Sequence, residues 1–243
     1  MSHQTIRSPY RRVLLKLSGE SLMGDQKFGI DSATCDRMAL EIQELSQFGV
    51  QVGIVIGGGN LFRGARANDT GMKRTPADQI GMLATLMNGI ALQQAFEKIG
   101  AECRVLSAIS SDSIVESYSW KRALHYLDQG VFVVFVGGTG NPYFTTDSAA
   151  ALRALEMGAE ILFKATKVDG IYDKDPFKYP DAVRFDRLTY SEVLARGLEV
   201  MDPAAIALCR ENKMPIAVFN LFEKGALKRA ICGESVGTIV EER

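Results

Sequence analysis

The sequence predicts an α/β protein, a three-layer αβα sandwich with a mostly parallel central sheet. Two observations support this. Short apolar runs alternate with amphipathic segments along the chain, a pattern typical of parallel strands joined by covering helices. The runs are apolar throughout rather than alternating, as expected of strands buried on both faces. The 243 residues contain no linker, low-complexity tract or internal repeat, so we expect one domain spanning residues 1–243.

Seven short apolar runs are expected to form the strands of this sheet. They are residues 12–18, 50–56, 103–109, 131–136, 160–165, 215–220 and 237–241. Most are rich in Val, Ile, Leu or Phe, as buried strands are. Because consecutive parallel strands need a crossover connection, most of the intervening segments should contain helices.

Amphipathic segments between these runs are expected to form the helices. Residues 32–48 carry apolar side chains at helical spacing, and Gly49 should end that helix. A longer helix should have Thr75 as its N-cap and Pro76 at its first position, and should run to Ile99.

The polar loop "GGTGNPYFTTD" after the fourth strand is expected to lead into another helix. That helix should open at Thr145 or Thr146 and close at Gly158. The loop offers many hydrogen-bond donors, its "YF" pair could wall off a base or sugar, and the helix N-terminus favours an anion.

Charge and composition exclude several classes of function. The formal net charge is −1 at pH 7, so no global basic field favours nucleic acid or an anionic membrane. The run 131–136 is too short for a membrane helix, and we expect no signal peptide because the first residues lack an apolar core. Since the only histidines are His3 and His125, a Ser-His-Asp hydrolase is not expected.

The cysteines are scattered without C-x-x-C spacing. They are Cys35, Cys103, Cys209 and Cys232. This arrangement excludes a recognisable zinc or redox motif and indicates reduced thiols in a cytoplasmic protein.

Gly, Thr, Lys, Arg and Asp gather after four of the predicted strands, where ligands of open α/β sheets bind. These strand ends carry Lys16 in "KLSGES", the triplet Gly57–Gly59 followed by Arg63, the loop from Gly137, and "KATKVDGIYDKDP" from Lys164. Bare backbone N–H groups at a strand end can cradle an anion. The clustering therefore indicates a ligand site at this edge.

The glycine triplet matches neither of the familiar phosphate motifs. A Walker loop needs Lys-Ser/Thr after its last glycine, whereas Ala65 follows Gly64 here. The dinucleotide fingerprint fails because Phe62 stands where its third glycine belongs.

Three charged residues could form a phosphoryl-transfer centre. Lys16 lies in an otherwise buried strand, where an ammonium must reach solvent at an edge or face an anion. Asp147 could simply compensate the helix dipole as an acid in the first turn, or it could orient the ammonium groups of Lys16 and Lys164 toward one phosphoryl group. Asp78, one turn inside the helix begun by Pro76, could be a simple early-turn acid or could accept from two ribose hydroxyls.

These stretches resemble the bacterial uridylate kinase family, a branch of the amino-acid kinase superfamily. The matching stretches are "LLKLSGE", "VIGGGNLFRG", "DQIGMLATLMNGIAL", "GTGNPYFTTDSAA", "KATKVDGIYDKDP" and "LTYSEV…LEVMD", from Leu14 to Asp202, and the flanking segments fit too. The pairing of "GGGN-x-FRG" with "GTGNP-aromatic-Phe-TTD" is specific. Tyr143 stands where the family usually has Phe, and Gly138 where Ala is common, which predicts a slightly looser loop.

The resemblance implies an amino-acid kinase-like fold and ATP-dependent phosphorylation of UMP to UDP in pyrimidine nucleotide synthesis. Residues 1–158 would hold UMP, and residues 159–243 with the loop after the first strand would hold ATP. Mg²⁺ would come with ATP, with no protein metal ligands. Lys16, Asp147 and Lys164 would be catalytic. ATP would contact Lys16, Leu17, Ser18, Gly19, Gly59, Arg63, Thr166, Tyr172 and Asp175. UMP would contact Gly58, Asp78, Thr139, Gly140, Asn141, Pro142, Tyr143, Phe144, Thr145 and Thr146.

The family is typically a homohexamer that GTP activates and UTP inhibits, so the resemblance implies both effectors here. The activator-linked segment would be Gly24, Asp25, Gln26, Lys27, Phe28 and Gly29. On its residues alone, this segment could equally be a mobile surface loop. No nucleic-acid or membrane partner is expected.

Two other classes of function stay open. A carboxylate, carbamate or amino-acid kinase of the same superfamily would share Lys16 and the glycine triplet, but it should lack "NPYF" and should not need Asp78. A non-catalytic nucleotide sensor would keep the loops and lose the charges that transfer needs, whereas Lys16, Asp147 and Lys164 are all present.

Overall fold

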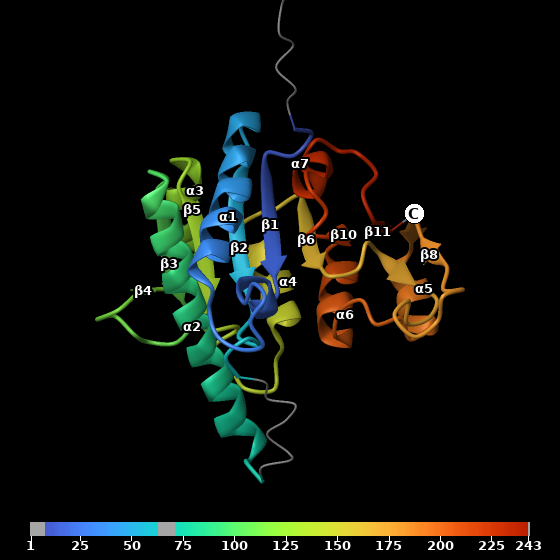
Figure 1. Cartoon of the computed structure of the whole chain (residues 1–243), viewed down its shortest axis with the longest axis horizontal. Helices are drawn as coiled ribbons and strands as arrows, with labels where there is room; N and C mark the ends of the chain where they lie inside the picture. The colour runs from blue at the N-terminus through green and yellow to red at the C-terminus, as the bar shows by residue number, and fades with distance from the viewer. Residues whose placement is uncertain (1–7, 63–70, 243) are drawn as a thin grey trace, which may run out of the picture.

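The strands form one central sheet in the computed structural model, which describes residues 8–62 and 71–242. They are β1 (Arg12–Leu17), β2 (Gln51–Ile56), β3 (Cys103–Ser107), β4 (Glu116–Ser117), β5 (Phe132–Val136), β6 (Ile161–Thr166), β9 (Arg187–Leu188), β10 (Ile216–Asn220) and β11 (Thr238–Val240). Their order across the sheet is β4-β3-β5-β2-β1-β6-β10-β11-β9. Neighbours pair in parallel except β10 with β11, which is antiparallel (Figure 1).

Helices cover both faces of this sheet, so the predicted three-layer αβα architecture is confirmed. One face carries α1 (Ser32–Gln43), α2 (Arg74–Lys98) and α7 (Ala226–Ile231), and the other carries α3 (Trp120–Asp128), α4 (Thr146–Glu156), α5 (Tyr190–Ala195) and α6 (Pro203–Glu211). Side chains of β1 alternate between the two cores: Leu15 and Leu17 pack under α1 and α2, whereas Leu14 packs toward α4. This alternation turns Lys16 toward α4.

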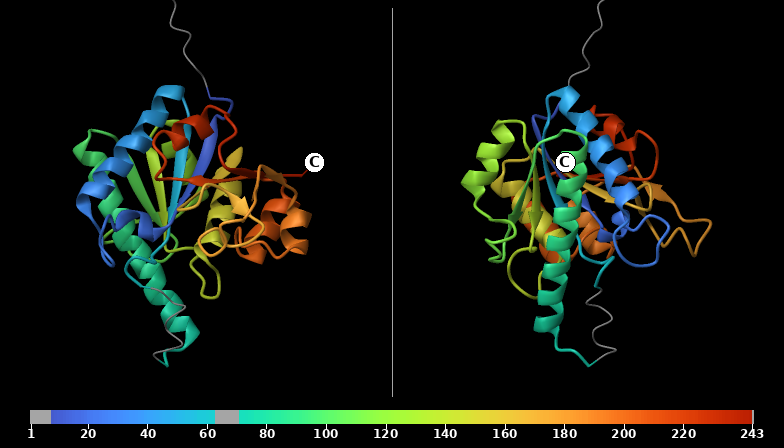
Figure 2. Two further views of the ribbon diagram at one scale, coloured as in Figure 1. Left: turned by 45° about the vertical axis from the view of Figure 1, so that its right-hand side comes forward. Right: turned by 60° about the vertical axis from the view of Figure 1, so that its left-hand side comes forward.

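Two features extend from the layered body (Figure 2). The N-terminal part of α2 projects past the carboxyl ends of the strands. On the other side, β7 (Ile171–Tyr172) and β8 (Arg184–Phe185) pair as a separate antiparallel hairpin. Within the described part of the chain, no helix combines the length and the apolarity that crossing a membrane requires.

The expected strands are all present, with ends shifted by no more than two residues. The first expected helix is α-helical only to Gln43. It continues as a 3₁₀ turn, η2 (Glu44–Phe48), and stops at Gly49, which is left-handed at φ 74°. Thr145 caps α4 by accepting from the backbone N–H groups of Asp147 and Ser148.

The predicted start of the long helix is wrong. α2 begins at Arg74, and its N-cap residue is Lys73, which makes no side-chain capping bond. Thr75 is therefore inside the helix, and Pro76 is its third residue rather than its first. A proline is tolerated there because the N–H groups of the first turn have no acceptor within the helix.

Candidate active site

Lys16, Asp147 and Lys164 meet at the carboxyl end of the sheet. β1 pairs with β6 so that Lys16 lies directly beside Lys164, and Asp147 lies in the first turn of α4 above them. Nζ of Lys16 is 2.9 Å from Oδ1 of Asp147, and Nζ of Lys164 is 3.0 Å from Oδ2. The three side chains are only 12–15% exposed. The structure thus brings together the three residues that the sequence suggested as a centre.

The charges of this cluster depend on its burial. Burial alone would raise the pKa of Asp147, but the ammonium groups of Lys16 and Lys164 outweigh it and hold that pKa below its ordinary value. Burial lowers the pKa of Lys164, although Asp147 acts in the opposite direction. Two ammonium groups around one carboxylate leave a net positive centre that suits an anionic ligand.

Asp202, the N-cap residue of α6, supports this cluster, and the sequence did not single out a role for it. Its carboxylate accepts from the hydroxyls of Thr145 and Ser148, the latter at 2.9 and 3.0 Å, and from the N–H of Ala205 at 3.0 Å. The carbonyl of Val200 accepts from Nζ of Lys164. The segment before α6 therefore fixes both the start of α4 and one of the lysines.

The larger cavity beside the cluster has a volume of about 420 Å³. Of the residues assigned to UMP, it is lined by Gly58, Asp78, Thr139, Asn141, Phe144, Thr145 and Thr146. Gly140, Pro142 and Tyr143 are not among its lining residues. Residues that the sequence did not single out also line it: Glu20, Phe62, Arg74, Gly81, Met82 and Thr85.

Asp78 ties α2 to the loop after β5. Nε of Arg74 donates to both of its carboxylate oxygens at 2.9 and 2.7 Å, and the backbone N–H of Tyr143 donates to Oδ2 at 2.7 Å. Tyr143 is left-handed at φ 71°, uncommon for a residue with a side chain, and its ring is 67% exposed beneath the guanidinium of Arg74. Tyr143 therefore does not line the cavity that it was expected to wall, whereas Phe144 does.

Close packing explains the glycines around this site. A Cβ on Gly19 would lie 2.6 Å from the carbonyl oxygen of Gly57, and a Cβ on Gly58 would lie 2.8 Å from Cβ of Ala84. The loops after β1 and β2 can approach each other and α2 only because these residues lack side chains. Gly59 has open space instead, and it lines the larger cavity.

Lys16 and Lys164 line a smaller cavity of about 220 Å³. Of the residues assigned to ATP, Lys16, Ser18 and Thr166 line it, and so does Lys164, which was assigned to catalysis. Leu17 and Gly19 are buried and are not among its lining residues. Glu20 borders both cavities. The two cavities therefore adjoin at Glu20. Lys16 and Lys164 line the smaller one, and Thr145 and Thr146, next to Asp147 in the chain, line the larger one, a layout suited to transfer between two ligands.

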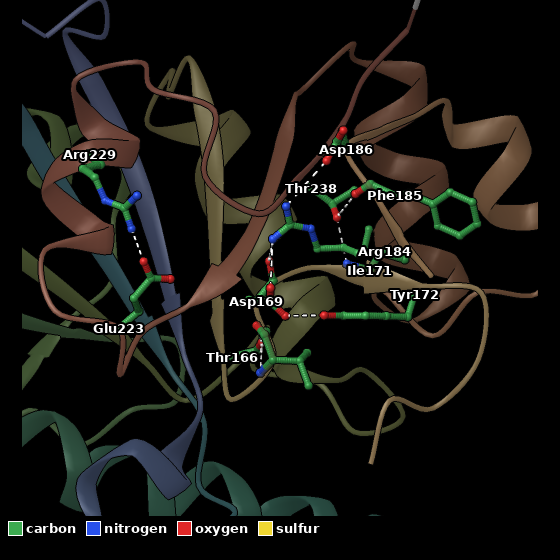
Figure 3. Close-up of polar contacts among 11 residues, drawn as sticks. Thr166, Asp169, Ile171, Tyr172, Arg184, Phe185, Asp186, Glu223, Arg229 and Thr238 are labelled. Atoms are coloured by element: carbon green, nitrogen blue, oxygen red, sulfur yellow. Dashed lines mark hydrogen bonds and ion pairs between the residues drawn. The ribbon is translucent and has the colours of Figure 1, made fainter. Parts of the chain in front are cut away.

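The remaining residues assigned to ATP lie elsewhere. Arg63 falls outside the described residues. Tyr172 and Asp175 belong to the hairpin region and line neither cavity: the hydroxyl of Tyr172 donates to Oδ1 of Asp169 at 2.5 Å (Figure 3), and Asp175 accepts from the N–H of Phe177 at 3.0 Å.

The segment assigned to an activator is an exposed loop. Asp25, Gln26, Lys27 and Phe28 all have exposed side chains. Gly29 is anchored to Asn60, which donates from Nδ2 to its carbonyl at 2.9 Å and accepts from its N–H through the backbone carbonyl at 3.1 Å. The loop is thus joined directly to the turn that follows the glycine triplet.

The donor set suits magnesium carried on phosphates. Among residues 8–62 and 71–242, no three His, Cys, Asp or Glu side chains gather into a group that could hold a metal ion. Asp147 is taken up by two ammonium groups. Mg²⁺ in nucleotide sites is commonly held through phosphate oxygens and only one or two carboxylates.

Comparison with known proteins gives one family over nearly the whole chain. The model of the amino acid kinase family matches residues 11–220. The chain is 54% identical to the uridylate kinases of Xanthomonas euvesicatoria pv. vesicatoria and Xanthomonas axonopodis pv. citri, in each case over 96% of this chain and 98% of the relative.

Solved structures agree with this similarity. UMP kinase from Bacillus anthracis has a TM-score of 0.92 at 39% identity, covering 96% of both chains. UMP kinase from Ureaplasma parvum has a TM-score of 0.90 at 37% identity, covering 96% of this chain and 99% of that one. Uridylate kinase from Archaeoglobus fulgidus has a TM-score of 0.71 at 29% identity, covering 94% and 99%.

Proposed function

This chain belongs to the amino acid kinase family, and from that premise we propose that it transfers the γ-phosphoryl group of ATP to UMP, giving ADP and UDP. The observation that carries the proposal is the meeting of two adjoining cavities beside the cluster of Lys16, Asp147 and Lys164. The 54% identity to proteins named uridylate kinase supports UMP as the acceptor.

The chemistry requires positioning and cationic charge rather than a base. An oxygen of the UMP phosphate bonds to the γ-phosphorus, and the bond from that phosphorus to the β,γ-bridging oxygen breaks to release ADP. A phosphate monoester is largely ionised at pH 7, so no residue has to remove a proton. Asp147, with a lowered pKa and an ammonium group at each oxygen, instead holds Lys16 and Lys164 where they can stabilise the negative charge of the loose transition state.

The two cavities would divide the substrates between them. UMP would occupy the larger cavity, with its phosphate toward Gly58, and the ATP phosphates would occupy the smaller one, beside Ser18. Gly59, assigned to ATP but lining the larger cavity, would lie at the junction of the two phosphates. Thr166, Tyr172 and Asp175 would surround the base and sugar of ATP, and Arg63 would neutralise the phosphate junction. Magnesium bound with ATP would offset further phosphate charge. Residues 1–158 would then form the acceptor half of one domain, and residues 159–243 with the loop after β1 would form the donor half.

Substrate choice tests this proposal. Initial rates of ADP release should be measured with UMP, CMP, dTMP, aspartate, glutamate and acetylglutamate as acceptors. We expect UMP to give the highest turnover efficiency. Preference for an amino acid would assign the chain to the carboxylate kinases, and nucleotide binding without turnover on any acceptor would make it a sensor.

Asp78→Asn should raise the KM for UMP about tenfold while changing the KM for ATP little. A carboxylate in the larger cavity can accept from ribose hydroxyls, and a hydrogen bond to a charged group contributes roughly 1.5–3 kcal/mol. Asp36→Asn, which removes an exposed carboxylate paired with Lys98, is the control. A shift in ATP saturation alone would show that the two cavities have been assigned backwards.

We further propose that the chain assembles as a homohexamer, partly through α2. Ile80, Leu83, Met87 and Ile90 lie at helical spacing along its outer face and are exposed, Leu83 and Met87 by more than half. A row of large apolar side chains of this kind marks an interaction surface. Sedimentation of the protein and of Leu83→Asp tests this: a monomeric wild-type protein would contradict the proposal.

GTP should activate the enzyme without being consumed, UTP should inhibit it, and replacing Asp25, Gln26 and Lys27 by Gly-Ser-Gly should weaken the GTP response. The physical reason is the anchoring of this loop through Gly29 to Asn60, beside the glycine triplet. Coupling between such sites is typically about 1–3 kcal/mol. Initial rates against ATP, with and without GTP, measure it in both proteins. An intact response in the replaced protein would place the activator site elsewhere.

We place the reaction in the cytoplasm, in pyrimidine nucleotide synthesis. All four cysteines are free thiols, which agrees with a reducing compartment. Fractionation of the source cells tests the location: activity recovered with membranes or outside the cell would contradict it. Depletion of the protein tests the pathway, since the cellular pool of UDP should then fall.

A further inference from the structure

A buried threonine on α2 holds the start of the loop that follows β5. Thr85 is 4% exposed, and its hydroxyl oxygen accepts from the backbone N–H of Gly137 at 2.7 Å. The same hydroxyl donates to the carbonyl of Met82 at 2.6 Å, which fixes its orientation. Gly137, at φ 75°, is the first residue after the strand and turns the chain toward the larger cavity.

A buried asparagine one turn further along α2 holds the loop after β2. Asn88 is fully buried, and its Nδ2 donates to the carbonyl of Gly57 at 2.7 Å. Asn88 and Asn60 also exchange side-chain hydrogen bonds at 2.7 and 2.9 Å. The glycine triplet is therefore bound to α2 at its first residue and just beyond its last.

α2 packs closely against both β5 and the loop after β2. A Cβ on Gly89 would lie 2.5 Å from Cγ1 of Val136, at the end of β5, and a Cβ on Gly58 would lie 2.8 Å from the carbonyl oxygen of Gly81. Thr85 and Asn88 are three residues apart and share one face of the helix. One rigid element thus sets the distance between the two loops that line the larger cavity.

We propose that Thr85 and Asn88 are positioning residues of the acceptor site, which set the spacing between the glycine triplet and the loop 137–146. The inference rests on the proposed function, in which UMP occupies the larger cavity. Both residues act through other groups. Thr85 lines the cavity, but its hydroxyl is engaged by Gly137 and Met82, and Asn88 acts through Gly57 and Asn60. Their loss should therefore affect UMP and leave ATP almost unaffected.

The donor side of the molecule offers a matched control. Thr238 is fully buried, and its hydroxyl oxygen accepts from the backbone N–H of Ile171 at 2.8 Å, just as Thr85 accepts from Gly137. The same hydroxyl donates to the carbonyl of Phe185 (Figure 3). Thr238 therefore holds the β7–β8 hairpin next to Tyr172, far along the chain from the acceptor loops.

The test compares Thr85→Val, Thr85→Ser and Thr238→Val. Valine keeps the shape of threonine but leaves a buried N–H without an acceptor, whereas serine restores the acceptor. We expect T85V to raise the KM for UMP about tenfold, because one buried N–H group loses its acceptor. The KM for ATP should stay within about twofold of wild type. T85S should return the KM for UMP to within about threefold of the wild-type value, and T238V should leave the KM for UMP within about twofold of that value.

Several results would overturn the inference. They are an unchanged KM for UMP in T85V, an equal rise in T238V, and a failure of T85S to restore it. If T85V does not fold, Thr85→Ala takes its place with the same expected outcomes, and Asn88→Ala gives a second reading through Gly57. A wild-type enzyme without UMP-dependent ADP release would instead defeat the proposed function, so the two failures are distinguishable.

Discussion

Lys16→Met should lower turnover about 10³-fold, because it removes a buried cation that stabilises charge in the transition state. Methionine has a similar length and is comfortable in a buried strand, so the fold should remain. Asp147 keeps its contact with Lys164, so no buried carboxylate is left unpaired. Steady-state rates with saturating UMP and ATP measure the loss, and circular dichroism checks the fold.

Lys167→Met is the matched control for this variant. Lys167 lines the same smaller cavity, but its side chain is 56% exposed and it pairs with Glu20. Removing that charge should change turnover by less than about tenfold, as expected for an exposed ion pair. Near-normal turnover in a folded Lys16→Met enzyme would contradict the role of this cation.

Asp147→Asn should destabilise the fold and nearly abolish turnover. The substitution keeps the shape but leaves the ammonium groups of Lys16 and Lys164 side by side without their carboxylate. Removing one partner from a buried ionic cluster typically costs about 3–5 kcal/mol, and these side chains are 12–15% exposed. Urea unfolding at one protein concentration measures the cost, with Asp36→Asn as a surface control expected to lose about 1 kcal/mol or less.

The difference in unfolding free energy between wild type and Asp147→Asn should change with pH in one direction. The folded-state pKa of Asp147 lies below its ordinary value of 3.8, so its contribution to stability is present above pH 3.8 and is lost as the pH falls through the folded value. The gap in unfolding free energy between wild type and Asp147→Asn should therefore narrow below pH 3.8. A gap that stays constant down to the acid-unfolding limit would show that Asp147 is not held ionised by the lysines.

The layers and strands could be predicted because their signals are local. Runs such as 131–136 are apolar on both faces, and this pattern predicts a buried strand without knowledge of the strands beside it. The helix cap at Thr145 and the stop at Gly49 are also local signals. The start of α2 could not be read in the same way, because Lys73 and Arg74 carry no capping signal.

Short elements late in the chain were not predicted. The hairpin of β7 and β8 has two residues in each strand, too few to show a period, and α5 and α7 have six residues each. Their positions depend on contacts distant in sequence, such as that of Thr238 with Ile171. Only the folded chain brings these partners together.

Of the candidate site, too, only the part with local sequence signals could be predicted. The charged centre could be suspected because Lys16 lies in an otherwise buried strand and because Lys16 and Lys164 lie at the ends of neighbouring strands near Asp147. Asp202 and Thr85 could not, because a helix N-cap acid and a helical threonine look ordinary until their partners across the fold are known. The pair of Arg74 with Asp78 also needed the true start of α2.

Transfer from ATP to UMP requires two nucleotides to meet at the cluster of Lys16, Asp147 and Lys164. A crystal structure with UMP and a non-hydrolysable ATP analogue tests it most directly. We expect UMP in the larger cavity and the γ-phosphate of the analogue within hydrogen-bond distance of Nζ of Lys16 and of Lys164. Nucleotide phosphates bound away from both ammonium groups, in a crystal saturated with both ligands, would contradict it.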